Sequence, residues 1–219
     1  MATAPTTTRL RLTEIFASVQ GEASRSGLPT VFVRLTGCPL RCNWCDTEYA
    51  FHGGQTRTLD DILDEIAGHG LPQVCVTGGE PLAQKGCLSL LTALCDAGYD
   101  VSLETSGALD IAQVDPRVSR IMDLKAPGSG EVDKNRLDNL DHLGPRDEIK
   151  IVIANPADYA WACEQLTTHR LAARCAVLFS PVEGQLAPAE LAQWIIRDRL
   201  PVRFQIQLHK ILWADARGR

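Results

Sequence analysis

The stretch VFVRLTGCPLRCNWCD, residues 31–46, joins a short apolar segment to three closely spaced cysteines. The segment Val31–Leu35 is rich in valine and almost wholly apolar, a pattern typical of a strand buried on both faces of a parallel sheet. Cys38, Cys42 and Cys45 follow it directly, with three and then two residues between them. Three thiols this close can surround one metal centre, so the sequence predicts a strand that leads into a metal-binding loop.

Short apolar segments of this kind recur along the chain and alternate with helix-like segments. The further strand-like segments are Val74–Thr77, Val101–Glu104, Arg120–Leu124, Ile149–Ile153, Ala176–Phe179 and Val202–Ile206. The expected helices are Leu59–Gly68, Leu82–Ala97, Lys134–Leu143, Ala157–Thr168 and Ala189–Arg199. Alternation of strands and helices predicts right-handed crossovers and a parallel sheet.

The length of the chain limits how far such a sheet can close. The chain has 219 residues, and a complete eightfold α/β barrel takes about 250. We therefore predict an α/β fold, a partial (open) TIM-like barrel of about six to seven parallel strands with abbreviated helices. A flat, doubly wound sheet is the alternative. The crossover between Glu104 and Arg120 is expected to lack a full helix, because it is short and Pro116 interrupts it.

The composition is that of an ordinary globular domain, with 45% hydrophobic and 22% charged residues. We expect one domain over residues 1–219, with a disordered lead at residues 1–8 and an extra strand at Arg9–Ile15 before the barrel. A formal net charge of −5 argues against binding to nucleic acid or an anionic membrane. No apolar stretch reaches the roughly 18 residues of a membrane span, and the N-terminus lacks a signal-peptide pattern, so a cytoplasmic location is expected.

Coordination number separates the metal centres that the three cysteines could hold. Structural zinc takes four ligands, and His52 is the only near candidate for a fourth. A 4Fe–4S cluster on three cysteines leaves one iron open to a small molecule, whereas electron-carrying ferredoxins ligate all four irons. The cysteine loop therefore favours an open 4Fe–4S cluster. The other cysteines, which stand singly and are expected to pack in the core, are Cys75, Cys87, Cys95, Cys163 and Cys175.

The C-x3-C-x2-C spacing resembles the signature of the radical S-adenosylmethionine (SAM) superfamily, in which the open iron binds SAM. Trp44 matches the aromatic residue usual before the last cysteine, and Gly78-Gly79-Glu80-Pro81 resembles the superfamily's GGEP motif. Alone, the second motif is also consistent with a plain strand–helix turn. The residues that the resemblance implies as SAM contacts are Trp44, Cys45, Asp46, Gly79, Glu80, Ser106, Asp123, Leu124, Lys125, Ser180, Pro181, Val182 and Glu183.

Further segments are similar to those of the 7-carboxy-7-deazaguanine synthase family over nearly the whole chain. They are Val19-Gln20-Gly21-Glu22, Arg34, Cys45-Asp46-Thr47 and Gln207-Leu208-His209-Lys210. The resemblance implies a carbon–nitrogen lyase that converts 6-carboxy-5,6,7,8-tetrahydropterin to 7-carboxy-7-deazaguanine with loss of ammonia, in queuosine and 7-deazapurine biosynthesis. It implies substrate binding by Val19, Gln20, Gly21, Glu22, Arg34, Thr77 and His209, and the Arg34 guanidinium is suited to the substrate carboxylate.

The same resemblance implies Mg²⁺ bound by Thr47, whose hydroxyl is a hard oxygen donor. It also implies a flavodoxin or ferredoxin as electron donor, and a homodimer. Two alternatives stay open. A glycyl-radical-enzyme activase shares the length and the cysteine spacing but acts on a protein. A non-catalytic zinc or iron–sulfur module would leave the polar residues at the predicted sheet edge without a purpose.

Overall fold

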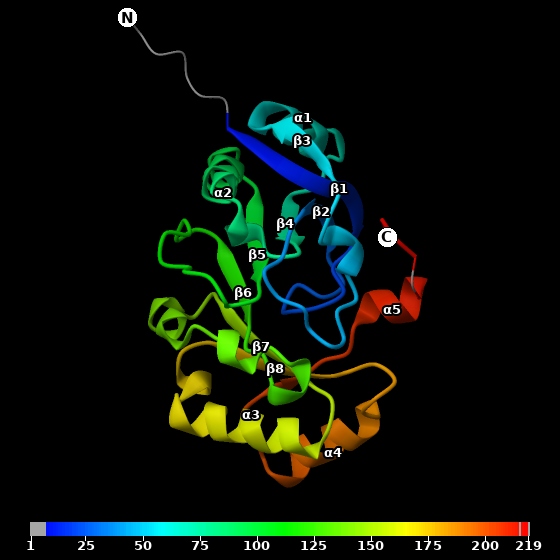
Figure 1. The fold of residues 1–219 in the computed structure, drawn as a ribbon, viewed down its shortest axis with the longest axis vertical. Coiled ribbons are helices and arrows are strands. Elements are labelled where there is room, and N and C mark those ends of the chain that lie inside the picture. Colours follow the sequence, from blue (N-terminus) through cyan, green and yellow to red (C-terminus); the bar gives the residue numbers. More distant parts are fainter. Residues whose placement is uncertain (1–7, 215, 219) are drawn as a thin grey trace, which may run out of the picture.

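The protein is built on one curved, open sheet with helices along its outer side (Figure 1). The computed structural model describes residues 8–214 and 216–218, so that residues 1–7 of the expected disordered lead lie outside the described residues. The strands are β1 (Arg9–Val19), β2 (Pro29–Leu35), β3 (Gln55–Thr58), β4 (Gln73–Gly78), β5 (Asp100–Thr105), β6 (Ser119–Asp123), β7 (Glu148–Ile153), β8 (Ala176–Pro181) and β9 (Arg203–Phe204). The helices are α1 (Leu59–Gly68), α2 (Gly86–Asp96), α3 (Pro156–Thr168), α4 (Pro188–Arg197) and α5 (Leu208–Trp213).

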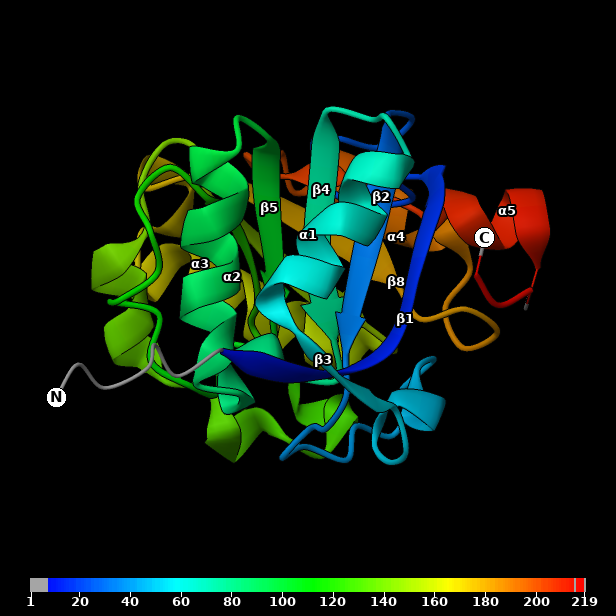
Figure 2. The same cartoon turned by 90° about the horizontal axis from the view of Figure 1, so that it is seen from above.

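The strand order determines which face of the sheet the helices cover. In the described chain it is β3-β1-β2-β4-β5-β6-β7-β8-β9, and every pairing from β2 to β9 is parallel. From β2 to β9 the strands follow one another in chain order, so right-handed crossovers place the helices on one face of the sheet. Figures 1 and 2 show α1 to α4 along that face. A doubly wound sheet would reverse its order. The predicted open barrel is confirmed, and the flat alternative is wrong.

The N-terminal strand lies antiparallel to β2 and β3 and extends the sheet. The expected strand at Arg9–Ile15 is confirmed, and it continues to Val19, directly before the polar loop that joins β1 to β2. β3 was not predicted, because its sequence QTRT has no apolar pattern and its hydrogen bonds to β1 define it.

Most helices form where their caps predict them. Thr58 and Asp61 make a reciprocal capping box at the start of α1, which has the expected bounds Leu59–Gly68. The expected helix Leu82–Ala97 begins only at Gly86, because Pro81–Ala83 forms a separate 3-10 turn capped by Glu80.

The predicted helix Lys134–Leu143 is wrong, since this segment contains 3-10 turns instead. The Asn139 amide explains the difference. Its Nδ2 donates to the carbonyl oxygens of Gly107 and Leu109 at 3.0 and 2.8 Å, and so binds the segment to the β5–β6 connection. That connection, all of it described, contains no helix, which confirms the abbreviated crossover.

The loop between β1 and β2 runs across the amino ends of the parallel strands. The Ser24 amide donates to both oxygens of Glu148, at the start of β7, at 3.1 and 3.0 Å. Arg25 forms an ion pair with Asp100 at the start of β5 and donates to Ser119 at the start of β6. The loop thus covers the amino end of the barrel, and the carboxyl end stays available for a site.

One buried ion pair gives a test of this packing. Asp147 is 3% exposed and accepts hydrogen bonds from the Arg120 backbone and guanidinium and from the Gly144 amide. Asp147→Ala leaves a largely buried guanidinium unpaired, so we expect the free energy of unfolding to fall by about 3–5 kcal/mol. In Asp141→Ala, which removes an exposed partner of Arg174, the loss should be below about 1 kcal/mol. Urea denaturation of both variants measures the difference, and equal losses would contradict this account.

Candidate active site

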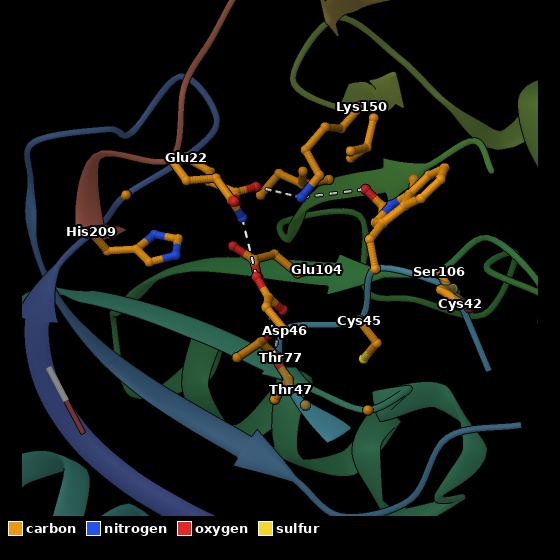
Figure 3. Close-up of a pocket in the computed structure, with 18 of the residues that line it drawn as sticks. Glu22, Cys42, Cys45, Asp46, Thr47, Thr77, Glu104, Ser106, Lys150 and His209 are labelled. Carbon is orange, nitrogen blue, oxygen red and sulfur yellow. Dashed lines mark hydrogen bonds and ion pairs between the residues drawn. The ribbon is translucent and has the colours of Figure 1, made fainter. Parts of the chain in front are cut away.

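A cavity of about 360 Å³ lies within the barrel, where the carboxyl ends of the parallel strands meet (Figure 3). Its wall comes from the β1–β2 loop, the cysteine loop, the inner strands and the segment around α5. The predicted site residues that line it are Val19, Gln20, Gly21, Glu22, Arg34, Cys38, Cys42, Trp44, Cys45, Asp46, Thr47, Thr77, Gly79, Ser106, Asp123, Lys125, Pro181, Val182, Glu183 and His209.

The cysteine loop is held in place by its neighbours. The Asn43 amide nitrogen donates to the Ser129 carbonyl at 2.9 Å, and the Asn43 side chain donates to the Gly128 carbonyl at 2.9 Å. The Arg41 amide donates to Glu131, and the Arg41 guanidinium lies over the Phe51 ring. These contacts fix a loop that has no regular secondary structure of its own.

The three thiols all line the same wall and are half-buried. Burial raises the pKa of Cys38, Cys42 and Cys45, so ligation of a metal centre there must displace protons. Among the described residues, no three His, Cys, Asp or Glu side chains lie close enough together to hold a single metal ion. A 4Fe–4S cluster needs no such gathering, since each thiolate binds a different iron. The donor set therefore fits a cluster with one open iron.

Two glycines let the next strand approach the cysteine loop closely. Gly78 has a φ of +154°, and a Cβ there would lie 2.2 Å from the Leu35 carbonyl oxygen. At Gly79 a Cβ would lie 2.3 Å from the Gly37 carbonyl oxygen and 2.8 Å from Cys38 Cβ. Only glycine fits at these positions, and the Gly79 backbone stands directly against Cys38, a predicted cluster ligand.

Among the predicted SAM contacts, Glu80, Leu124 and Ser180 do not line the cavity of the described structure. Glu80 is fully buried, and its carboxylate accepts hydrogen bonds from Leu82, Thr105 and Ser106, which join the GGEP turn to the end of β5. Ser180 Oγ is buried without a hydrogen-bond partner in the described chain, while the next two residues line the cavity. Roles for these three in SAM binding stay predictions.

An alternating row of charges, Glu22–Lys150–Asp123–Lys125, crosses the cavity wall, and we call it the charge row. Lys150 pairs with Glu22, its Nζ lies 3.5 Å from Asp123 Oδ1, and Lys125 Nζ donates to Asp123 Oδ2 at 2.6 Å. Burial alone would lower the pKa of Lys150, but Asp123 and Glu22 raise it well above its ordinary value. Burial alone would raise the pKa of Asp123, but the two lysines lower it. Lys150 and Asp123 therefore stay ionised at neutral pH.

A second carboxylate faces the same space as Glu22. Glu104 Oε1 accepts a hydrogen bond from Gln20 Nε2 at 3.2 Å, and Glu104 Oε2 accepts one from Thr77 Oγ1 at 2.9 Å. Figure 3 shows Glu22, Glu104 and His209 directed toward the centre of the cavity from three different segments. Two carboxylates with an amide between them suit a ligand rich in ring N–H groups.

Arg34, on β2 beside Thr77 of β4, is held with part of its guanidinium unused. Its Nε donates to Glu14 Oε1 at 2.8 Å, and Tyr49 donates to the same oxygen at 2.7 Å. The guanidinium also lies near the rings of Phe16 and Tyr49. The two terminal nitrogens make no hydrogen bond within the described chain, which leaves a planar fork for a carboxylate.

Thr47 follows the last cysteine of the loop by two residues and lies beside Asp46. Its hydroxyl donates to Asp46 Oδ1 at 2.8 Å, and Gln207 Nε2 reaches Asp46 Oδ2 at 3.2 Å. The hydroxyl and the carboxylate together offer hard oxygen donors, the kind that Mg²⁺ prefers.

Sequence reasoning did not assign roles to several residues of this site. Lys150 has the appearance of an ordinary strand residue, because nothing in β7 shows that its partners come from β6 and from the β1–β2 loop. Glu104 and Gln207 were expected at the sheet edge without a function. Glu14 and Tyr49 act through Arg34 and carry no motif of their own.

The arrangement of site and fold defines a class of protein. Residues 32–125, from β2 through the cysteine loop to Lys125, match the family model of the Radical SAM superfamily. The matched range includes the three cysteines and the glycine turn.

Whole-chain comparisons specify the family. The chain is 49% identical over 213 residues to the 7-carboxy-7-deazaguanine synthase of Chlorobaculum tepidum, covering 95% of this chain and 97% of that one. It is 42% identical to the 7-carboxy-7-deazaguanine synthase of Koribacter versatilis, covering 94% and 97%. A crystal structure of QueE from Escherichia coli has the same fold, with a TM-score of 0.73, 23% identity, and coverage of 92% and 95%. The chain belongs to the 7-carboxy-7-deazaguanine synthase family of radical SAM enzymes.

The close approach at Gly79 predicts the effect of a single methyl group. In Gly79→Ala the new Cβ must push Gly37 and Cys38 away, so the cluster ligands shift. We expect weaker cluster absorbance and iron content after reconstitution, and activity lower by about 100-fold, as for a displacement of about 1 Å at a reacting centre. Gly68→Ala, in α1 with no atom within 4 Å of its new Cβ, is the matched control and should keep full iron content. Full iron loading in both variants would contradict the prediction.

Proposed function

We propose that the protein converts 6-carboxy-5,6,7,8-tetrahydropterin to 7-carboxy-7-deazaguanine with loss of ammonia, a step of queuosine and 7-deazapurine biosynthesis. The observation that carries this proposal is the 49% identity, over 95% of the chain, to a 7-carboxy-7-deazaguanine synthase. In support, the residues expected for substrate binding lie together in one cavity with the three cysteines.

As a radical SAM enzyme the protein uses a 4Fe–4S cluster and SAM. Cys38, Cys42 and Cys45 would hold the cluster, which together with bound SAM would supply 5′-deoxyadenosyl radical chemistry. The protein itself orients the substrate and keeps water away. Asp123 holds the Lys125 ammonium, and the Asn135 side-chain amide holds the Lys125 backbone. In this proposal the Lys125 ammonium faces the part of the cavity that binds SAM.

Two kinds of side chain recognise the pterin in this proposal, carboxylates and a guanidinium. Glu22 and Glu104 accept hydrogen bonds from ring N–H groups, and Gln20 adds an amide at the same edge. Arg34 presents its two terminal nitrogens to the substrate carboxylate, while Glu14 holds the guanidinium by Nε. Substrate so held places its reacting carbon toward the cysteine end of the cavity.

The remaining expectations belong to the same proposal. Thr47 holds Mg²⁺ together with substrate oxygens and water. A flavodoxin or ferredoxin supplies the electron, and two chains form a homodimer in the cytoplasm. None of the helices formed by the described residues has the length and apolar character needed to cross a bilayer. Size-exclusion chromatography with light scattering tests the dimer.

The function is tested on anaerobically reconstituted protein. With SAM, dithionite, Mg²⁺ and 6-carboxytetrahydropterin, we expect mass spectrometry to detect 7-carboxy-7-deazaguanine. Cys42→Ala should abolish the product because one cluster ligand is lost, whereas Cys163→Ala, which changes a thiol of α3 outside the cavity, should not. Cleavage of SAM without this product would discard the substrate and favour a glycyl-radical-enzyme activase. A colourless protein containing zinc would favour a non-catalytic module.

The magnesium site is tested by a pair of variants that differ in one hydroxyl. Thr47→Ala removes the proposed oxygen ligand, so we expect activity to fall by about 10- to 100-fold and its Mg²⁺ dependence to weaken. Thr47→Ser keeps the hydroxyl and should keep most of the activity. Steady-state rates over a Mg²⁺ titration measure both effects. An unchanged Mg²⁺ dependence in Thr47→Ala would rule out this ligand.

A further inference from the structure

Two segments far apart in the sequence lie side by side at the edge of the cavity. Figure 3 shows the C-terminal segment with His209 beside the segment that carries Glu22. Leu208 donates its amide to the Gly21 carbonyl at 3.0 Å, and Gln207 Nε2 donates to Glu22 Oε1 at 2.6 Å. The packing is close, because a Cβ at Gly21 would lie 2.1 Å from His209 Nδ1.

Ala23, the residue after Glu22, has an unfavourable backbone. Its φ is +62°, in the left-handed region where residues other than glycine pay a steric cost, and it is 3% exposed. This conformation turns the chain sharply between Glu22, which faces the cavity, and Ser24, which binds Glu148 at the amino end of the barrel. Within the loop, Ser26 N donates to the Ala23 carbonyl at 3.2 Å, and contacts from outside the loop add to this stabilisation.

The side-chain amide of Gln205 forms hydrogen bonds with both the N–H and the carbonyl group of Ala23. Ala23 N donates to Gln205 Oε1 at 2.8 Å, and Gln205 Nε2 donates to the Ala23 carbonyl at 3.0 Å. Gln205 is itself anchored, since its own amide donates to the Phe179 carbonyl of β8 at 3.0 Å. A primary amide carries both a donor and an acceptor, so one side chain satisfies both backbone groups of a buried residue.

We propose that Gln205 is a positioning residue for substrate recognition. By holding Ala23 in the left-handed conformation, its amide directs the neighbouring Glu22 carboxylate into the cavity, and it does so without touching the substrate. The proposal rests on the function proposed above, because it assigns Glu22 to the pterin. Gln205 was not among the residues that sequence motifs indicated.

The chain supplies a matched control with the same geometry elsewhere. Gln84 binds the backbone of Arg11 in the same two-sided way, with its Oε1 2.8 Å from Arg11 N and its Nε2 2.8 Å from Arg11 O, and its Nε2 also donates to the Thr36 carbonyl at 2.9 Å. Gln84 does not line the cavity of the described structure. Comparison of Gln205→Ala with Gln84→Ala separates the loss of an amide pair in general from the loss of this one.

The experiment uses anaerobically reconstituted full-length enzyme with SAM. Two readouts are compared, the KM for 6-carboxytetrahydropterin and the affinity for 7-carboxy-7-deazaguanine by calorimetry, which needs no turnover. For Gln205→Ala we expect KM and Kd to rise by about 10-fold, from the loss of two hydrogen bonds, with a smaller change in kcat and with unchanged SAM affinity. Gln84→Ala should leave both pterin values unchanged, and urea denaturation checks that each variant is folded.

A rescue variant tests the cause. In Gln205→Ala/Ala23→Gly, glycine adopts the left-handed conformation without the steric cost, so most of the lost affinity should return. Unchanged pterin affinity in Gln205→Ala, equal effects of Gln205→Ala and Gln84→Ala, or absence of rescue by glycine would each overturn the proposal. If wild-type enzyme neither converts nor binds these ligands, the proposed function fails and this inference fails with it. Wild-type conversion with an unaffected Gln205→Ala defeats the inference alone.

Discussion

Four buried or half-buried charges in one cavity wall are tolerated only because they alternate in sign. In the charge row, each inner member has an oppositely charged neighbour on both sides, which offsets the cost of removing it from water. The members come from the β1–β2 loop, from β7 and from the end of β6, so the row also fixes these elements relative to one another. At one end of the row, the Lys125 ammonium partly opposes the rise that burial causes in the pKa of Cys42. At the other end, Glu22 belongs to the proposed pterin pocket.

A barrel that does not close leaves backbone groups that no neighbouring strand satisfies. In this protein, side-chain amides form hydrogen bonds with such backbone groups. Gln205 pairs with Ala23, Gln84 with Arg11 and Asn135 with Lys125, each through one donor and one acceptor, as a strand partner would. An amide can be placed wherever the chain passes, so it can hold an irregular loop in a shape that regular pairing cannot produce. The loops that form the site are irregular for this reason and are nevertheless well fixed.

The sequence is sufficient for those parts of the molecule that local patterns determine. Apolar segments locate the parallel strands, Thr58 locates the start of α1, and the cysteine spacing locates the predicted cluster. Prediction fails where distant residues decide the structure. β3 has no apolar pattern, the segment at Lys134–Leu143 is determined by Asn139 contacts rather than by helix propensity, and β9 covers only Arg203–Phe204 of the expected Val202–Ile206. Lys150 is the clearest example in the site, since its function depends on partners 27 and 128 residues away that no local motif can indicate.

The last residues of the chain support the proposed substrate pocket. Gln207 binds Glu22. The Arg217 guanidinium lies 4.4 Å from the centre of the Tyr49 ring, and Tyr49 and Arg34 share an oxygen of Glu14. In a complete barrel, strand pairing would fix such groups as part of the cooperative fold. Here individual side-chain contacts fix them, and each contributes little to the global free energy of unfolding. Substrate recognition can therefore change through this segment while the barrel and the cysteine loop stay folded.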